Sequence, residues 1–183
     1  MFGLGQKKGF TLVEVLITIA ILGILSSMGV AGLMGAVENA RVNGVAKRTV
    51  AFMERMGKES KRLSTTLCLK MANDQRIEVY KSDDCSNPPA DSLFDHMDIE
   101  APMKFVSVCP DIADACELSE NCGVNLLDGT SGVFVPKIGL ASLPVSGYVC
   151  AQYGSSDHYA AAVKSKEENF VKPLTYEDDE WFW

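Results

Sequence analysis

One stretch near the N-terminus limits the folds open to this chain more than any other feature. Residues 10–37 are 28 consecutive residues that contain a single charged side chain, Glu14. As an α-helix they would be about 42 Å long, at about 1.5 Å per residue. About 20 apolar residues are enough to cross the hydrocarbon core of a bilayer. Residues 10–37 are therefore predicted to span a membrane, in contrast to the polar, acidic residues 65–183.

Charges and cysteines indicate which side of the membrane each end occupies. Lys7 and Lys8 are the only charges before the apolar run, and the positive-inside rule keeps them cytoplasmic. All six cysteines follow the run: Cys68, Cys85, Cys109, Cys116, Cys122 and Cys150. An even number of cysteines on one side of a membrane is typical of disulfide bonds in an oxidising compartment. Both patterns place the C-terminal region outside the cytoplasm, with buried thiols in a cytosolic domain as the alternative.

Glu14 is the unusual residue of the apolar run. A charged side chain deep in a bilayer costs ~2.5–3.5 kcal/mol on insertion scales, so a partner for Glu14 is expected. A conventional secretory signal peptide, cleaved near residues 29–31, is the alternative. The apolar run continues past that point, however, and a discarded segment has no need of a buried acid.

Residues 7–14, KKGFTLVE, resemble the processing motif of type IV prepilins and type II secretion pseudopilins. A small residue, an aromatic residue, Thr-Leu and a lone acid all match in one register. The resemblance implies that residues 1–9 are a leader peptide, which prepilin peptidase removes after Gly9. It also implies that Phe10 becomes the N-methylated mature N-terminus. The partners it implies are other pilin subunits, prepilin peptidase, an inner-membrane assembly platform with its ATPase, and the lipid bilayer before assembly.

The spacing of this motif has a physical reason. Cleavage before Phe10 creates a positive α-amino group at the end of an apolar helix, and Glu14 lies about one turn further on. In a bundle of such helices, Glu14 of one chain can pair with the amine of its neighbour and neutralise two charges in an apolar environment. We therefore interpret Glu14 as an assembly residue that selects the register between chains. Related pilins often have a proline where this chain has Ala31.

Residues 38–64 are predicted to continue the helix as an amphipathic segment. Apolar or small side chains recur every three or four residues and form one stripe: Val42, Val45, Thr49, Phe52, Met56 and Leu63. No proline interrupts the chain before Pro88. A helix that leads directly into a hairpin loosely resembles minor pseudopilins of the H type.

Residues 65–183 are predicted to form an extracytoplasmic β-rich head. A hairpin is expected over residues 66–72 and 75–82, with further strands at 104–109, 132–138, 147–153 and 158–164. Residues 83–103 are predicted to be a long loop, and residues 111–122 a short helix. The expected fold class is α+β and pilin-like. Its long N-terminal helix, transmembrane in the first half, packs on one mostly antiparallel sheet of four to six strands.

Other candidate sites have simpler explanations. Cys68 and Cys85 bracket the hairpin and can close across it, and the other four cysteines allow two more bridges, but six cysteines permit 15 pairings. The cysteine spacings lack the Cys-x-x-Cys knuckle of zinc sites, so no metal is expected. Asp111, Asp114, Glu117 and Glu120 indicate either a calcium site or a solvated acidic face. The solvated face is preferred because no calcium-loop pattern is present.

The remaining patterns oppose catalysis and nucleic-acid binding. His96 and His158 are the only histidines, and no nucleophile motif or phosphate loop accompanies them, so neither an enzyme nor a cofactor is expected. The net charge of −7 argues against a nucleic-acid binder. A group of helix cations is interpreted as a solvated face, with DNA contact as the alternative: Lys47, Arg48, Arg55, Lys58, Lys61 and Arg62. The aromatic tail 176–183 is expected to dock on the head, with sugar or partner binding as the alternative.

These patterns together predict a structural subunit of a type IV pilus or a type II secretion pseudopilus. It would sit in the inner membrane as a single-pass protein and then enter the filament. One alternative is a minor pilin at the filament tip that binds DNA, carbohydrate or a surface. Another is a periplasmic domain on a single-pass anchor that never polymerises.

Overall fold

The computed structural model describes residues 10–112, 124–129, 131–136, 146–164, 171–177 and 179–182. The side chains of residues 28–32 are outside this description, although their backbone is helical. The chain divides into two compact units, Met1–Val37 and Glu38–Trp183.

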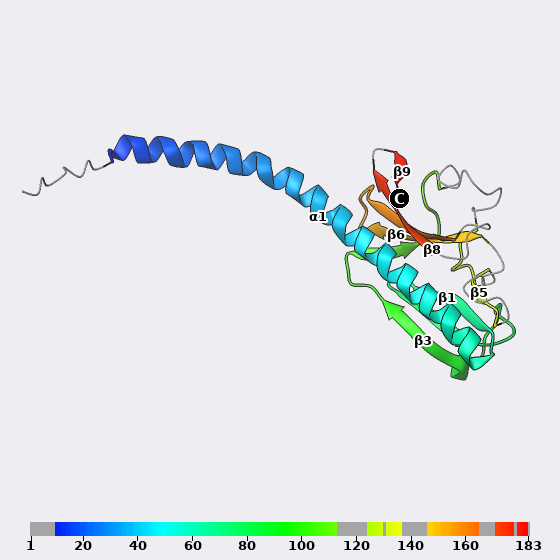
Figure 1. Cartoon of the computed structure of the whole chain (residues 1–183). Coiled ribbons are helices and arrows are strands. Elements are labelled where there is room, and N and C mark those ends of the chain that lie inside the picture. Colours follow the sequence, from blue (N-terminus) through cyan, green and yellow to red (C-terminus); the bar gives the residue numbers. More distant parts are fainter. Residues whose placement is uncertain are drawn as a thin grey trace, which may run out of the picture. The chain divides into compact units, whose positions relative to one another are not determined.

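One helix, α1 (Leu12–Leu63), confirms the predicted long N-terminal helix (Figure 1). It ends in a Schellman motif, because Ser64 adopts a left-handed φ of 52°. The amide of Ser64 donates to the carbonyl of Lys61, and the amide of Thr65 donates to the carbonyl of Ser60. Lys61 and Arg62 lie in the last turn, where their positive charges interact favourably with the negative end of the helix dipole.

The first unit contains the apolar part of α1. Every side chain from residue 10 to residue 27 is exposed, including Phe10 at 82% and Leu12 at 76%. Within the ranges that the structure describes, no helix has the length and apolar character that crossing a membrane requires. The membrane span predicted for residues 10–37 is not confirmed by the structure.

The second unit contains two antiparallel sheets, which confirms the predicted α+β class with an antiparallel head, although one sheet was expected and not two. The first has the order β3-β2-β1-β5, formed by Leu93–Asp98, Arg76–Lys81, Leu67–Asn73 and Val133–Phe134. The second has the order β4-β6-β7-β8-β9, formed by Met103–Val106, Gly147–Tyr153, Tyr159–Lys164, Val171–Glu177 and Glu180–Phe182. The predicted hairpin is present as β1 and β2.

Two parts of the head differ from the sequence-based expectation. The predicted loop over residues 83–103 contains a short 3-10 helix, Ala90–Ser92, and strand β3. Residues 171–177 and 180–182 form strands β8 and β9, where no strands were predicted. Most of the predicted helix over residues 111–122 lies outside the described residues.

The core of the head lies between the second half of α1 and the sheets (Figure 1). Val45, Phe52 and Met56, all from the predicted stripe, are buried in it. They share one hydrophobic cluster with residues of both sheets, namely Leu69, Ile77, Val79, Phe105 and Val149. Burying each such side chain stabilises the fold by about 1.5–3 kcal/mol. The amphipathic half of α1 therefore organises the head.

Candidate functional site

The start of α1 is held by a helix cap. The backbone amide of Glu14 donates to Oγ1 of Thr11 over 3.2 Å, and the amide of Val15 donates to the carbonyl of Thr11 over 3.3 Å. Thr11 therefore satisfies an amide that would otherwise lack a partner in the first turn. Thr-x-x-Glu is the sequence of a capping box, a signal that the sequence-based interpretation of Glu14 did not use. The acid of Glu14 also lies at the positive end of the helix dipole.

The polar side chains that follow are satisfied within the helix. Oγ1 of Thr18 donates to the carbonyl of Val15 over 2.8 Å, and Oγ of Ser27 donates to the carbonyl of Ile24 over 2.8 Å. A hydroxyl that donates to a backbone carbonyl of its own helix no longer needs water as a hydrogen-bond partner. Glu14 is left as the one charged side chain of this stretch. The surface of residues 10–27 is thus suited to an apolar environment.

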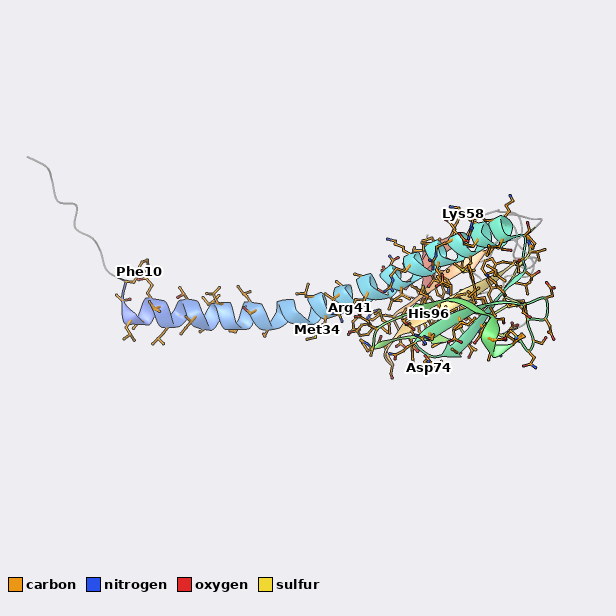
Figure 2. All side chains as sticks on the ribbon, turned by 90° about the horizontal axis from the view of Figure 1, so that it is seen from below. Phe10, Met34, Arg41, Lys58, Asp74 and His96 are labelled. Atoms are coloured by element: carbon orange, nitrogen blue, oxygen red, sulfur yellow. A yellow bond between two sulfur atoms is a disulfide. The ribbon has the colours of Figure 1, made fainter. Side chains whose placement is uncertain are left out.

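The predicted processing residues are only partly within the described chain. Phe10 is its first residue and is highly exposed (Figure 2), and Glu14 is exposed in the first turn of α1. The leader residues Lys7, Lys8 and Gly9 lie outside the described residues. Cleavage at Gly9, methylation of Phe10 and pairing of Glu14 remain predictions.

Two disulfide bonds cross-link the head. Cys68 of β1 is joined to Cys85, with Cα atoms 5.2 Å apart, so this bridge closes across the β1–β2 hairpin. Cys109 is joined to Cys150 of β6, with Cα atoms 5.9 Å apart. The predicted candidates Cys116 and Cys122 lie outside the described residues.

Polar contacts fasten the first turns of the second unit to sheet β4-β6-β7-β8-β9. Nδ2 of Asn39 donates to Oε1 of Glu177 over 2.7 Å, and a guanidinium nitrogen of Arg41 donates to the hydroxyl of Tyr153 over 3.2 Å. Nε2 of His158 lies 3.4 Å from Oε2 of Glu38. His158 therefore lies beside the first turns of the second unit, where its ring faces Glu38.

The second histidine, His96, lies at an open groove of about 500 Å³ between α1 and β3. Asp98 at this groove accepts two hydrogen bonds from Arg76, at 2.6 and 3.0 Å. These bonds lower the pKa of Asp98, and the same contact raises the pKa of Arg76. Arg55, which also lines the groove, forms an ion pair with Asp95 at 2.8 Å. The charged groups of the groove therefore largely satisfy one another.

The tail docks through aromatic side chains. Nε1 of Trp181 donates to the carbonyl of Pro110 over 2.9 Å. The ring of Trp181 lies 5.1 Å from that of Tyr176, which in turn lies 6.0 Å from that of Tyr159. These contacts tie β9 to the head, which agrees with the preferred interpretation of the tail.

Metal binding finds no support in the part of the chain that the structure describes. Those residues include no group of three or more histidine, cysteine, aspartate or glutamate side chains that could hold an ion. Of the four acids considered for calcium, only Asp111 is described.

Comparison with known proteins finds a match at the N-terminus alone. No curated protein and no solved structure matches the chain. Residues 4–30 match the family described as prokaryotic N-terminal methylation motif, and this range includes Gly9, Phe10, Thr11 and Glu14. The chain therefore carries the prepilin-type signal of type IV pilins and pseudopilins, followed by a long helix and an antiparallel β head.

Proposed function

We propose that this chain is a structural subunit of a type IV pilus or of a type II secretion pseudopilus. Prepilin peptidase cuts it after Gly9, Phe10 is methylated at the new amine, and chains polymerise through residues 10–37. The methylation motif over residues 4–30 is the observation that carries this proposal. In this role the chain is a building block and performs no catalysis.

The exposure of the first unit supports polymerisation. Large apolar side chains are exposed along residues 10–25: Phe10, Leu12, Val13, Val15, Leu16, Ile17, Ile19, Ile21, Leu22, Ile24 and Leu25. Leaving so much contiguous apolar surface in water is unfavourable, and patches of this size mark an interaction site. A bilayer before assembly, and the helices of other copies after it, would both cover this surface.

Glu14 supports an assembly role over simple anchoring. Placing a charged acid in an apolar environment costs free energy unless the acid has a partner of opposite charge. A helix that served only as a membrane anchor would not need an acid at this position. Cleavage after Gly9 supplies that partner as the ammonium of Phe10 on a neighbouring copy. Removing the leader also removes two lysines, so the mature chain has 15 basic and 24 acidic residues and a net charge of −9.

Mass spectrometry of the exported full chain tests the processing step. The mature protein should begin with N-methyl-phenylalanine at Phe10. An intact Met1 on exported protein would contradict the proposal.

Sheared filaments test the assembly step. Glu14→Ala should still be cleaved but should leave less than a tenth of the wild-type amount in filaments. Thr18→Ala, which removes a hydroxyl that is bonded within the helix, is the matched control and should assemble normally. Normal filaments from Glu14→Ala would favour an anchored domain that does not polymerise. Abundance in the filaments distinguishes a major subunit from a minor subunit at the tip.

A further inference from the structure

We propose that the lysines at the C-terminal end of α1 dock onto the β8–β9 turn of a second copy of this chain. This inference rests on the proposed assembly and names one contact between heads within it. Lys58 and Lys61 supply the positive charge, and Glu177 and Glu180 supply the negative charge.

The basic side of this contact is the outer face of α1. Residues 38–63 include seven lysines and arginines but three glutamates, whereas residues 64–183 have 8 basic and 20 acidic residues. The arginines of this face already have partners within the chain. For example, Arg55 forms an ion pair with Asp95, and Arg62 forms one with Glu59. Lys58 and Lys61 are exposed and form no ion pair in the described part of the chain. Lys58 lies on the side of the helix away from the strands (Figure 2).

The acidic side is the turn between β8 and β9. Glu177 and Glu180 are directly opposite each other in the strand register, and both are exposed. Like charges in such a cross-strand pair destabilise a sheet unless a cation lies between them. Within the described residues, Glu177 accepts a hydrogen bond from the neutral amide of Asn39, and Glu180 has no side-chain partner. Neither carboxylate of this pair is therefore ion-paired within the described residues, and a nearby cation would relieve their repulsion.

The two sides cannot meet within one chain. The contact between Asn39 and Glu177 places the acidic turn beside residue 39 of α1. Lys58 lies 19 residues further along the same helix, which corresponds to roughly 30 Å. At physiological salt, exposed charges are screened over about 8 Å, so these groups do not stabilise each other within one head. A second copy, shifted along the helix axis by about that length, brings them together.

Such a contact is heterologous, because different surfaces of the two copies meet. Heterologous contacts that do not close into a ring generate helical filaments. A nucleic acid would also attract the lysines, but the surrounding head is strongly acidic and would repel phosphates. A second copy carries both the cations and the acidic turn that needs them.

Carbodiimide cross-linking of assembled full-length chain tests this contact, since it joins a lysine amine directly to a carboxylate. A mixture of ¹⁴N- and ¹⁵N-labelled copies shows by mass spectrometry which links join two copies. We expect mixed-label links from Lys58 or Lys61 to Glu177 or Glu180. Glu180→Lys should lower their yield about fivefold or more, and reversing Lys58 and Lys61 to glutamate in the same chain should restore links between positions 58 or 61 of one copy and position 180 of another. Asp91→Lys, at an exposed acid without a side-chain partner among the described residues, is the matched control and should change nothing.

The outcomes separate this contact from the proposed function. Assembled wild-type chains without these links, or links that Glu180→Lys leaves unchanged, would overturn the contact and leave the filament role intact. Protection of Lys58 and Lys61 by added duplex DNA, without links between copies, would also overturn it. A wild-type chain that is neither methylated at Phe10 nor found in filaments would overturn both proposals.

Discussion

The amide of Glu14 donates to Oγ1 of Thr11, so one short contact fixes where α1 begins and which residue precedes it. The helix starts at Leu12, and Phe10 stays outside it as an exposed extension. A peptidase needs an extended, accessible backbone at its cleavage site, and the cap leaves Phe10 outside the helix. The cap thereby keeps Phe10 in the exposed state that cleavage by the proposed peptidase requires.

Replacing Thr11 by alanine tests the cap. The loss of an N-cap side chain costs ~1 kcal/mol, which corresponds to about fivefold faster amide exchange in the first turn of α1. Hydrogen exchange of the full chain, read at the amides of Glu14 and Val15, which are bonded to Thr11, measures this change. Thr11→Ser keeps an accepting oxygen and should exchange like the wild type. Equal exchange in the alanine and serine variants would show that Thr11 does not cap the helix.

Ser60 provides a test of how α1 is joined to the head. Its side chain is fully buried, and its single hydroxyl proton is shared between the carbonyls of Thr65, 2.8 Å from Oγ, and Phe134, 3.0 Å from Oγ. Ser60→Ala leaves both carbonyls without this donor and should lower the free energy of unfolding by about 1–3 kcal/mol. Urea unfolding of the full chain measures this. Ser92→Ala, which removes a surface bond to Pro89, should stay within about 0.5 kcal/mol of the wild type.

Two glycines are expected to respond to alanine in opposite directions. A Cβ at Gly132 would lie 2.2 Å from the carbonyl oxygen of Leu126 and 2.9 Å from Cβ of Leu69, so Gly132→Ala should destabilise the head by about 1–3 kcal/mol. A Cβ at Gly44 meets nothing within 4 Å, and Gly44→Ala should stabilise the helix by up to ~1 kcal/mol. Thermal unfolding compares the two variants. A stabilised Gly132→Ala protein would contradict the close packing at β5.

The pair of Arg76 and Asp98 predicts a dependence of stability on pH. The hydrogen bonds from Arg76 hold the pKa of Asp98 below its ordinary value of 3.8. A carboxylate with a lowered pKa in the folded state stabilises the fold above the unfolded pKa. This stabilisation is lost as the pH falls below about 4 and through the folded pKa. The free energies of unfolding of the wild type and of Arg76→Gln should therefore differ at pH 6 and become equal towards pH 2. Lys47→Gln removes a cation that has no ion-pair partner in the described chain. Its free energy of unfolding should therefore equal that of the wild type at both pH values.

Several strands of the head could not be predicted because their stability comes from distant partners. Strand β3, Leu-Phe-Asp-His-Met-Asp, does not alternate apolar and polar residues and buries only Met97, so its sequence resembles a loop. It nevertheless pairs with β2 from Arg76↔Asp98 to Tyr80↔Leu93. Strand β8 contains Pro173, which argues against a central strand. It is tolerated because, among the residues that the structure describes, β9 pairs only with residues 175–177 and does not reach Pro173.

The sequence by itself determined the features that depend on near neighbours along the chain. The helix Leu12–Leu63 follows from apolar periodicity and the absence of proline, the β1–β2 hairpin from two strand patterns around a short turn, and the methylation motif from consecutive residues. Only the tertiary structure decided the division into two sheets, the bridge between Cys109 and Cys150, and the cross-strand pair of Glu177 and Glu180. These depend on which distant segments pair, and pairing is selected by burial against the shared core, which no local pattern encodes.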